Sequence, residues 1–162
     1  MDGRLRSMTA VYITRGDEML LLYRVGSRVV APSWCGIGGH FEPGELGDAR
    51  ACALRELQEE TGLRERDLLG LAMRYVTLRL KNGEVRQNYY FFAELSPDAP
   101  EPGACTEGRL EWVPCDQLLA RSMPHTAYHM IKHYLETGRH TSVLYAGATV
   151  EDTVLFTPLK EF

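Results

Sequence analysis

Apolar runs bounded by turn residues recur along the first two thirds of the chain. They span residues 8–15, 18–25, 69–80 and 85–95. The first two runs are separated by Gly16-Asp17, and the second two by Lys81-Asn82-Gly83-Glu84, which contains the Asn-Gly pair preferred in tight hairpin turns. This pattern predicts two antiparallel hairpins, with a loop over 26–33 after the first of them.

A short helix is predicted between the two hairpins. Residues 49–60 are rich in strong helix formers, Asp48 is a suitable N-cap, and Gly62 stands where a left-handed C-cap is expected. Ala53, Leu54 and Leu57 lie on the side of this helix away from most of its acids. We therefore expect the helix to pack on a sheet with its apolar face and to present its acids outward.

The last third of the chain mixes short strands and helices. The pattern predicts a loop over 96–106, a strand over 109–113, a short helix over 114–121, a helix over 126–136 that ends at Gly138, and a closing hairpin of 142–148 and 153–157 around Glu151-Asp152. The sequence shows no repeat, linker or low-complexity segment. With 162 residues, it predicts a single domain over residues 1–162.

Composition and charge narrow the function. Hydrophobic residues make up 44% and charged residues 25%, and no apolar stretch approaches the ~20 residues of a membrane span. Without an apolar signal core at the start, we expect a cytoplasmic location and no membrane contact. The net charge of −4 argues against binding to a long nucleic acid, but it leaves room for a small anionic substrate. The four cysteines lack a paired spacing and are expected to be free thiols.

Three glutamates of the predicted helix suggest a metal site. At about 100° per residue, Glu56, Glu59 and Glu60 fall within one arc about a third of the circumference wide, and like charges packed so closely repel. Hard oxygen ligands of this kind suit Mg²⁺ or Mn²⁺. Three acids alone are more often a solvated helix face, but the glycines at 38–39 and at 62 favour the metal site.

The residues around these acids have chemical roles of their own. Gly38 and Gly39 let the backbone approach closely, so a carbonyl there can complete a metal shell or an amide can meet a phosphate oxygen. Arg55 can pair with an acid of the preceding loop and hold loop and helix together. The three glutamates would be metal ligands, or two of them ligands and one the general base.

The segment from Gly39 to Leu63 resembles the signature of the Nudix hydrolases. The family pattern is a glycine, five residues, Glu, seven residues, and then Arg-Glu-aliphatic-x-Glu-Glu-x-Gly-aliphatic. The matching residues are Gly39, Glu45, Arg55, Glu56, Leu57, Glu59, Glu60, Gly62 and Leu63. The chain departs from the pattern at one point, because nine residues separate Glu45 from Arg55. We expect a longer loop before Asp48, which leaves the ligand helix intact.

The resemblance implies an α/β fold, an α/β/α sandwich with a mixed sheet, and Mg²⁺-dependent hydrolysis of a nucleoside diphosphate linked to another group. A nucleoside triphosphate, cleaved to a monophosphate and pyrophosphate, is the leading substrate class. A preference for 8-oxo-dGTP is weakly supported, since similar enzymes read the base with an asparagine and two aspartates where this chain has Cys35, His125 and Thr126. The alternatives are a pyrophosphatase for ADP-ribose or another nucleoside diphosphate derivative, and a non-catalytic nucleotide sensor. Either a monomer or a homodimer fits.

Further candidates surround the signature. For the metal, we select Gly39 and the three helix glutamates, with Glu107 as an added loop acid. Glu111 competes with Glu107, although a charge-paired strand end suits Glu111 better. For the substrate, Arg24 and Arg28 would meet phosphates, His40 would donate to a phosphate, and Gly38 would approach it closely. Cys35 and His125 would contact the base, while Trp34 and Tyr128 would stack on it. A core position is a nearly as strong alternative for Trp34.

Overall fold

The structure is a computed structural model that describes residues 2–26 and 31–162. The strands are β1 (Arg4–Arg15), β2 (Glu18–Arg24), β3 (Ser33–Cys35), β4 (Leu68–Lys81), β5 (Glu84–Leu95), β6 (Gly108–Pro114), β7 (Leu144–Val150) and β8 (Thr153–Leu159). The α-helices are α1 (Ala49–Thr61) and α2 (His125–Glu136). The described residues also form four short 3-10 helices: η1 (Pro43–Glu45), η2 (Glu65–Asp67), η3 (Cys115–Ala120) and η4 (Gly138–His140).

The strands form a mixed sheet. Within the described residues its order is β3-β2-β1-β5-β4-β7-β8, and β6 also pairs with β2. The pairs β1–β5 and β4–β7 are parallel, and the other pairs are antiparallel. The mixed sheet expected from the family resemblance is therefore confirmed.

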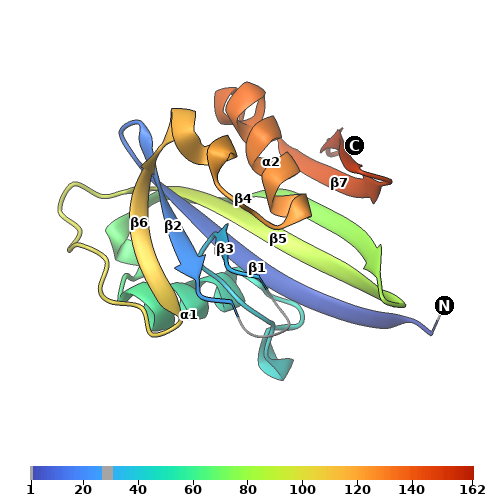
Figure 1. Cartoon of the computed structure of the whole chain (residues 1–162), viewed down its shortest axis with the longest axis horizontal. Coiled ribbons are helices and arrows are strands. Elements are labelled where there is room, and N and C mark those ends of the chain that lie inside the picture. Colours follow the sequence, from blue (N-terminus) through green and yellow to red (C-terminus); the bar gives the residue numbers. More distant parts are fainter. Residues whose placement is uncertain (1, 27–30) are drawn as a thin grey trace.

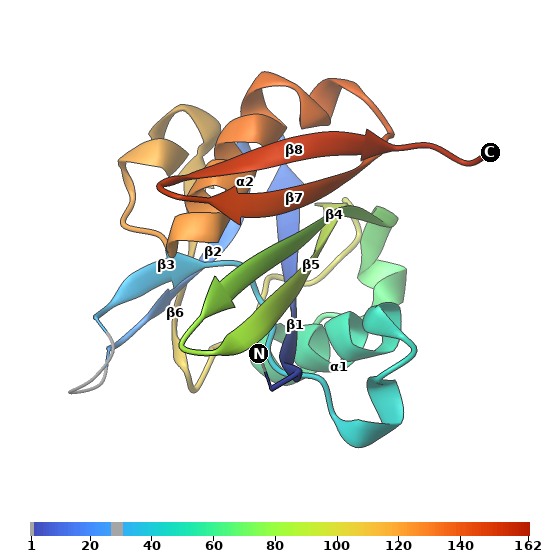
Figure 2. The ribbon, with the colours of Figure 1, turned by 90° about the vertical axis from the view of Figure 1, so that its right-hand side faces the viewer.

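The two α-helices lie on opposite faces of the sheet (Figure 1). Successive residues of a strand point to opposite faces, so Val11 packs with Leu57 on the α1 side while Tyr12 packs with Met130 on the α2 side. The β7–β8 hairpin lies next to α2 (Figure 2), and the His133 ring contacts Phe156 at a centroid distance of 4.6 Å. The α/β/α sandwich is thereby confirmed.

The local signals of the sequence are confirmed at the helix and at the turns. The Asp48 side chain accepts a hydrogen bond from the Ala51 amide at 3.0 Å, and Gly62 ends α1 with a left-handed φ of 76°. Asn82 and Gly83 have φ values of 53° and 73°, as a tight hairpin turn requires. The cysteines are free thiols, as expected.

The structure differs from the predicted elements where pairing between distant segments determines the bounds or the type of an element. β1 begins at Arg4, because it pairs with β5 from Arg4 onward. Ser33–Cys35 form a strand on β2, where a loop and its continuation were predicted. The helix predicted over 114–121 is the 3-10 helix η3. In the part of the chain that the structure describes, no helix combines the length and apolar character of a membrane span.

Candidate active site

The site lies where β1 and β2 separate. β2 pairs with β1 only over Glu18–Leu20, and its other half pairs with β3 from Leu22 to Arg24. The chain after β3 fills the gap beside β1, with isolated bridges from Val11 to Ile37 and from Met8 to His40. This inserted segment, residues 36–40, brings the glycine pair, the end of β2 and α1 together.

Both glycines of the pair lie close to their neighbours. A Cβ on Gly38 would lie 2.0 Å from the Thr9 carbonyl oxygen, and one on Gly39 would lie 2.5 Å from Glu56 Oε1. The Gly39 carbonyl accepts a hydrogen bond from the Thr9 amide at 2.9 Å, so it faces β1. The Gly38 carbonyl lies instead beside Arg24, and the Gly38 amide donates to Glu60 Oε2 at 3.0 Å. Gly38, rather than the expected Gly39, thus offers a carbonyl next to the acids.

Arg24 links two acids and a backbone carbonyl from three segments of the chain. Its Nη2 donates to the Gly38 carbonyl at 2.8 Å and to Glu60 Oε1 at 3.0 Å, and it lies 3.2 Å from Glu107 Oε2. Glu107 reaches this point because Gly108, the next residue, pairs with Arg24 between β6 and β2. Glu111 instead faces Arg109 on β6 and Arg121, the residue after η3. The structure therefore brings Glu107, and not Glu111, to the helix acids.

The three helix acids have different surroundings. Glu60 is buried, with 4% of its surface exposed, whereas the Glu59 side chain is 58% exposed at the rim. Burial raises the pKa of Glu60 against the effect of Arg24, and Glu107 and Glu56 raise it further. Burial also raises the pKa of Glu56, which Arg55 opposes. The prediction that the acids point outward is thus wrong for Glu60, because Gly38 and Arg24 cover this side chain.

A divalent cation fits this arrangement. Repulsion from Glu107 raises the pKa of both Glu56 and Glu60, and a bound cation would offset that repulsion. The three acids and the Gly38 carbonyl offer oxygen donors, which hard cations prefer. Among the residues that the structure describes, no three acidic, histidine or cysteine side chains already stand at metal-binding separations. Glu56 faces Arg55, and Glu60 and Glu107 face Arg24.

Arg55 ties the preceding loop to α1, as expected from the sequence. Its Nε and Nη2 hold Glu45 at 2.5 and 3.0 Å, and its Nη1 lies 2.9 Å from Glu56 Oε1. Glu45 ends η1, and the longer spacer is accommodated by the turn that follows, with Leu46 exposed and Asp48 at the cap. The longer loop before Asp48 is therefore confirmed.

The ion pair makes the stability that Glu45 contributes depend on pH. Hydrogen bonding to Arg55 lowers the pKa of Glu45 from 4.5 to about 2. Such a carboxylate stabilises the fold above its unfolded pKa, and the stabilisation is lost as the pH falls toward the folded pKa. We expect Glu45→Gln to lower the free energy of unfolding by about 3 kcal/mol at pH 7, and by less than about half of that at pH 3. Urea unfolding at both pH values measures this.

A matched variant controls for general charge effects. Glu65 pairs with Arg50 at an exposed position, so Glu65→Gln should change stability little at either pH. An equal loss of stability for Glu45→Gln at pH 7 and pH 3 would contradict the role of the ion pair.

Two adjoining cavities open at this point. The first, of about 320 Å³, is lined by the acids and the glycine turn, including Gly39, His40, Arg55, Glu56 and Glu107. The second, of about 240 Å³, lies between the sheet and α2. Arg24 and Gly38 line both cavities, so a ligand can extend from the acids into the second cavity, which we call the cleft.

Strand alternation divides the residues around β3. Cys35 and Ser33 line the cleft, and the Cys35 thiol donates to the Leu22 carbonyl at 3.5 Å. Trp34 is not among the described residues that line the cleft and belongs to the buried cluster of Tyr12 and Met130. It is 7% exposed and packs against the Tyr23 ring at 4.9 Å. The structure supports a core position for Trp34. It does not support stacking of Trp34 on a base.

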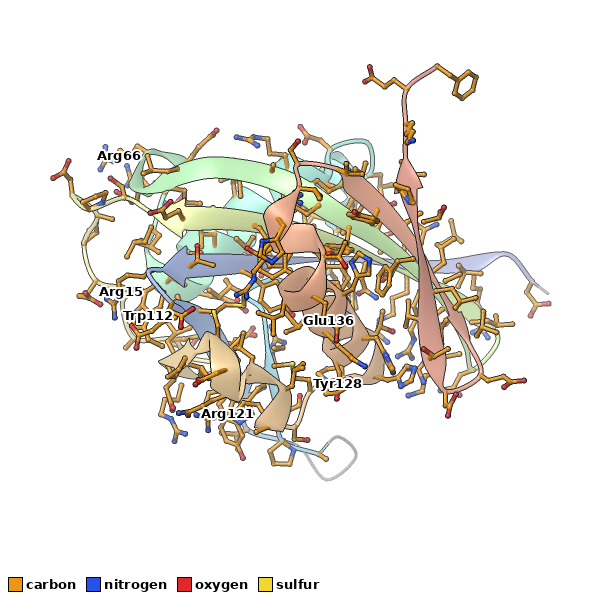
Figure 3. The ribbon with its side chains drawn as sticks, turned by 90° about the horizontal axis from the view of Figure 1, so that it is seen from above. Arg15, Arg66, Trp112, Arg121, Tyr128 and Glu136 are labelled. Carbon is orange, nitrogen blue, oxygen red and sulfur yellow. The ribbon has the colours of Figure 1, made fainter. Side chains whose placement is uncertain are left out.

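The start of α2 contributes other residues than expected. Thr126 and Ala127 line the cleft, whereas His125 and Tyr128 are not among its lining residues. The His125 and His129 rings meet edge-on at a centroid distance of 4.7 Å. Tyr128, which is labelled in Figure 3, contacts the His129 ring edge-on at 5.4 Å. Their predicted base contacts are therefore not supported, because only one stripe of the helix faces the sheet.

Two further candidates concern phosphate contacts. His40 lines the cavity at the acids, and its Nε2 is hydrogen-bonded to Arg6 at 2.9 Å. Arg28 lies outside the described residues.

Sequence reasoning missed the cleft residues of the central hairpin. Arg86, Asn88 and Tyr90 line the cleft from alternate positions of β5, and Arg79 lines it from β4. The signal was the pair of polar residues Arg86 and Asn88, whose spacing of two places both on one strand face. Recognising it requires knowing which strand face α2 leaves open.

Comparison with known proteins identifies the family. The family model described as the NUDIX domain matches residues 3–134. The fold resembles the mutator MutT protein of Bacillus halodurans, with 23% identity, 94% of this chain and 97% of that chain covered, and a TM-score of 0.65. It also resembles a C. elegans Ap4A hydrolase, with 18% identity, 85% and 99% covered, and a TM-score of 0.64.

A third solved structure covers only part of its own chain. The bifunctional NMN adenylyltransferase/ADP ribose pyrophosphatase of Francisella tularensis has 18% identity and a TM-score of 0.65, with 85% of this chain and 42% of that chain covered. Likenesses at this identity show the fold, whereas the family match spans most of the chain. The chain belongs to the NUDIX family and is a hydrolase of phosphoric anhydride bonds.

Proposed function

We propose that the protein hydrolyses the diphosphate linkage of a nucleotide with the help of Mg²⁺ or Mn²⁺, and that a nucleoside triphosphate is the leading substrate. The observation that carries this proposal is the junction at Arg24 and Gly38. There the cavity at Glu56 and Glu107 opens into the cleft between sheet and α2. The acids would act on the phosphates while the cleft holds the nucleoside.

Each residue of the junction has a role in this proposal. Glu56, Glu60, Glu107 and the Gly38 carbonyl would hold the metal, with Glu59 at the exposed rim. When bound, the metal neutralises phosphate charge and lowers the pKa of a water molecule. Arg55 fixes the Glu56 carboxylate, and one glutamate of the cluster accepts the proton of the attacking water.

The cleft would bind the nucleoside part of the substrate. Tyr90 and Ala127 give it apolar walls, and Thr126 and Asn88 offer polar groups to the base or sugar. Cys35 stands where the resemblance would require an amide for an oxidised guanine, and a thiol is only a weak donor and acceptor. The cleft therefore does not favour 8-oxo-dGTP over other nucleotides.

A second candidate is hydrolysis of ADP-ribose or another nucleoside diphosphate derivative. Arg79 and Arg86 line the cleft and are not among the described residues that line the cavity at the acids, so they favour a substrate with an additional polar or charged group in the cleft. The products distinguish the two candidates, because only a triphosphate releases pyrophosphate together with a monophosphate.

The test is a substrate panel with the purified protein. Canonical and oxidised nucleoside triphosphates, ADP-ribose and dinucleotides are incubated with Mg²⁺, with Mn²⁺ and with EDTA, and the products are separated by chromatography. We expect metal-dependent release of a nucleoside monophosphate. Tight nucleotide binding without hydrolysis by either metal would contradict the proposal and favour a nucleotide sensor.

A glycine substitution tests the geometry of the acid cluster. Because a Cβ on Gly39 would lie 2.5 Å from Glu56 Oε1, Gly39→Ala must displace that carboxylate. We expect the turnover number to fall about 10- to 100-fold, as for other groups that orient a metal ligand. Gly47→Ala is the matched control, since its Cβ would meet nothing within 4 Å. Steady-state kinetics of both variants measure the difference, and equal activities would contradict the placement of Glu56.

A further inference from the structure

Three arginines form a row across the central strands. Arg86 on β5 stands opposite Arg6 on β1 and opposite Arg79 on β4. Side chains at paired positions lie on the same face of a sheet, and like charges directly opposite each other destabilise it. Neither the fold nor the acid cluster requires such a row.

The row has little countercharge. Glu84 lies 3.1 Å from Arg86 and 3.7 Å from Arg6, so one carboxylate serves both arginines. Arg6 also binds His40. Within residues 2–26 and 31–162, no carboxylate lies within ion-pair distance of Arg79. The row therefore keeps an excess of positive charge in a chain whose net charge is −4.

This excess charge faces the cleft. Arg79 and Arg86 line it together with Arg24, and no acidic side chain is among its described lining residues. Arg24 is compensated by Glu60 and Glu107, whereas Arg79 is not. The field of Arg79 reaches α2, where burial first, then His129 and Arg79, lower the pKa of His125. The end of the cleft at β4 and β5 thus carries positive charge from Arg79 and Arg86.

We propose that Arg79 and Arg86 bind a phosphate group of the substrate that is remote from the hydrolysed bond, so that the substrate is a nucleotide whose sugar carries a further phosphate. The proposal rests on the proposed function, which places the scissile phosphates at Glu56 and Glu60 and the nucleoside in the cleft. Guanidinium groups bind phosphate bidentately, and a phosphate charge close to −2 matches two arginines. Asn88, two residues along the same strand face from Arg86, adds an amide donor.

A neutral base explains the row less well. An arginine can read a purine edge with two hydrogen bonds, but such a contact needs one guanidinium and brings no negative charge. It would leave the repulsion between Arg79 and Arg86 in place. A phosphate removes that repulsion when it binds.

Binding of nucleotide pairs tests the site without turnover. Calorimetry compares adenosine 2′,5′-bisphosphate and adenosine 3′,5′-bisphosphate with AMP, and the two bisphosphates distinguish the positions of the sugar phosphate. We expect at least one bisphosphate to bind about tenfold more tightly than AMP. The preference should fall to about onefold in Arg79→Gln and in Arg86→Gln. Arg139→Gln, which lies off the cleft, should keep it.

Two results would overturn the proposal: neither bisphosphate binds more tightly than AMP to the wild type, or Arg79→Gln retains the preference. Thermal unfolding checks that the variants fold. Arg79→Gln should melt at or above the wild-type temperature, because it removes the repulsion with Arg86.

Hydrolysis of matched pairs separates this proposal from the proposed function. NADP is compared with NAD, and ADP-ribose 2′-phosphate with ADP-ribose, each with Mg²⁺. No hydrolysis of any nucleotide together with an intact bisphosphate preference would contradict the enzyme assignment alone. Hydrolysis with no bisphosphate preference would contradict the phosphate site alone.

Discussion

Replacing Glu60 by glutamine should lower the turnover number about a thousandfold while changing the free energy of unfolding by less than about 1 kcal/mol. Glutamine has nearly the same shape, and its carbonyl can still accept the Gly38 amide that now donates to Glu60 at 3.0 Å. It removes, however, the most deeply buried charge of the proposed metal site. Burying that carboxylate is unfavourable, as its raised pKa shows, so the lost pairing with Arg24 is offset by a smaller desolvation penalty.

Steady-state kinetics and urea unfolding measure the two quantities on the same preparation. Glu111→Gln is the control, because Glu111 is also paired with arginines but lies away from the acids. Its turnover number should stay within about twofold of the wild type. A Glu60→Gln enzyme with near wild-type turnover would remove Glu60 from the mechanism.

Replacing Arg55 by glutamine should lower the free energy of unfolding by about 3 kcal/mol and the turnover number by about 100-fold. Arg55 contacts Glu45 with two nitrogens and Glu56 with a third, and its side chain is only 22% exposed. Its loss leaves the buried Glu45 carboxylate unpaired and frees the loop from α1. Glu56 then loses the contact that fixes its orientation.

Two further variants separate charge from geometry. Arg55→Lys keeps the charge but lacks the planar fork, so it should recover part of the stability and little of the activity. Arg50→Gln removes an arginine whose partner Glu65 is exposed, and it should cost at most about 1 kcal/mol. Urea unfolding and kinetics of the three variants check this. Full activity of Arg55→Lys would show that charge alone is sufficient.

The sequence alone predicted the elements that depend on neighbouring residues. Asp48 and Gly62 bound α1 as expected, since a cap needs only a suitable side chain or φ within one helical turn. Asn82-Gly83 closed its hairpin for the same reason. The spacing from Gly39 to Leu63 indicated the family and placed Arg55 against an acid of the preceding loop, because helical periodicity fixes which side chains share a face.

Other features were decided only by contacts between distant segments. The separation of β1 from β2 buried Glu60, turned the Gly38 carbonyl to Arg24 and sent the Gly39 carbonyl to Thr9. Pairing of β6 with β2 selected Glu107 over Glu111.

Register and orientation completed the cleft. The direction of β3 placed Cys35 in it and Trp34 in the core, and the strand pairing aligned Arg79 with Arg86. Local residue preferences determine whether a segment of the chain forms a helix, a strand or a turn. Which of its faces is covered, and by what, depends on strand partners and register, which are fixed only when the whole sheet forms.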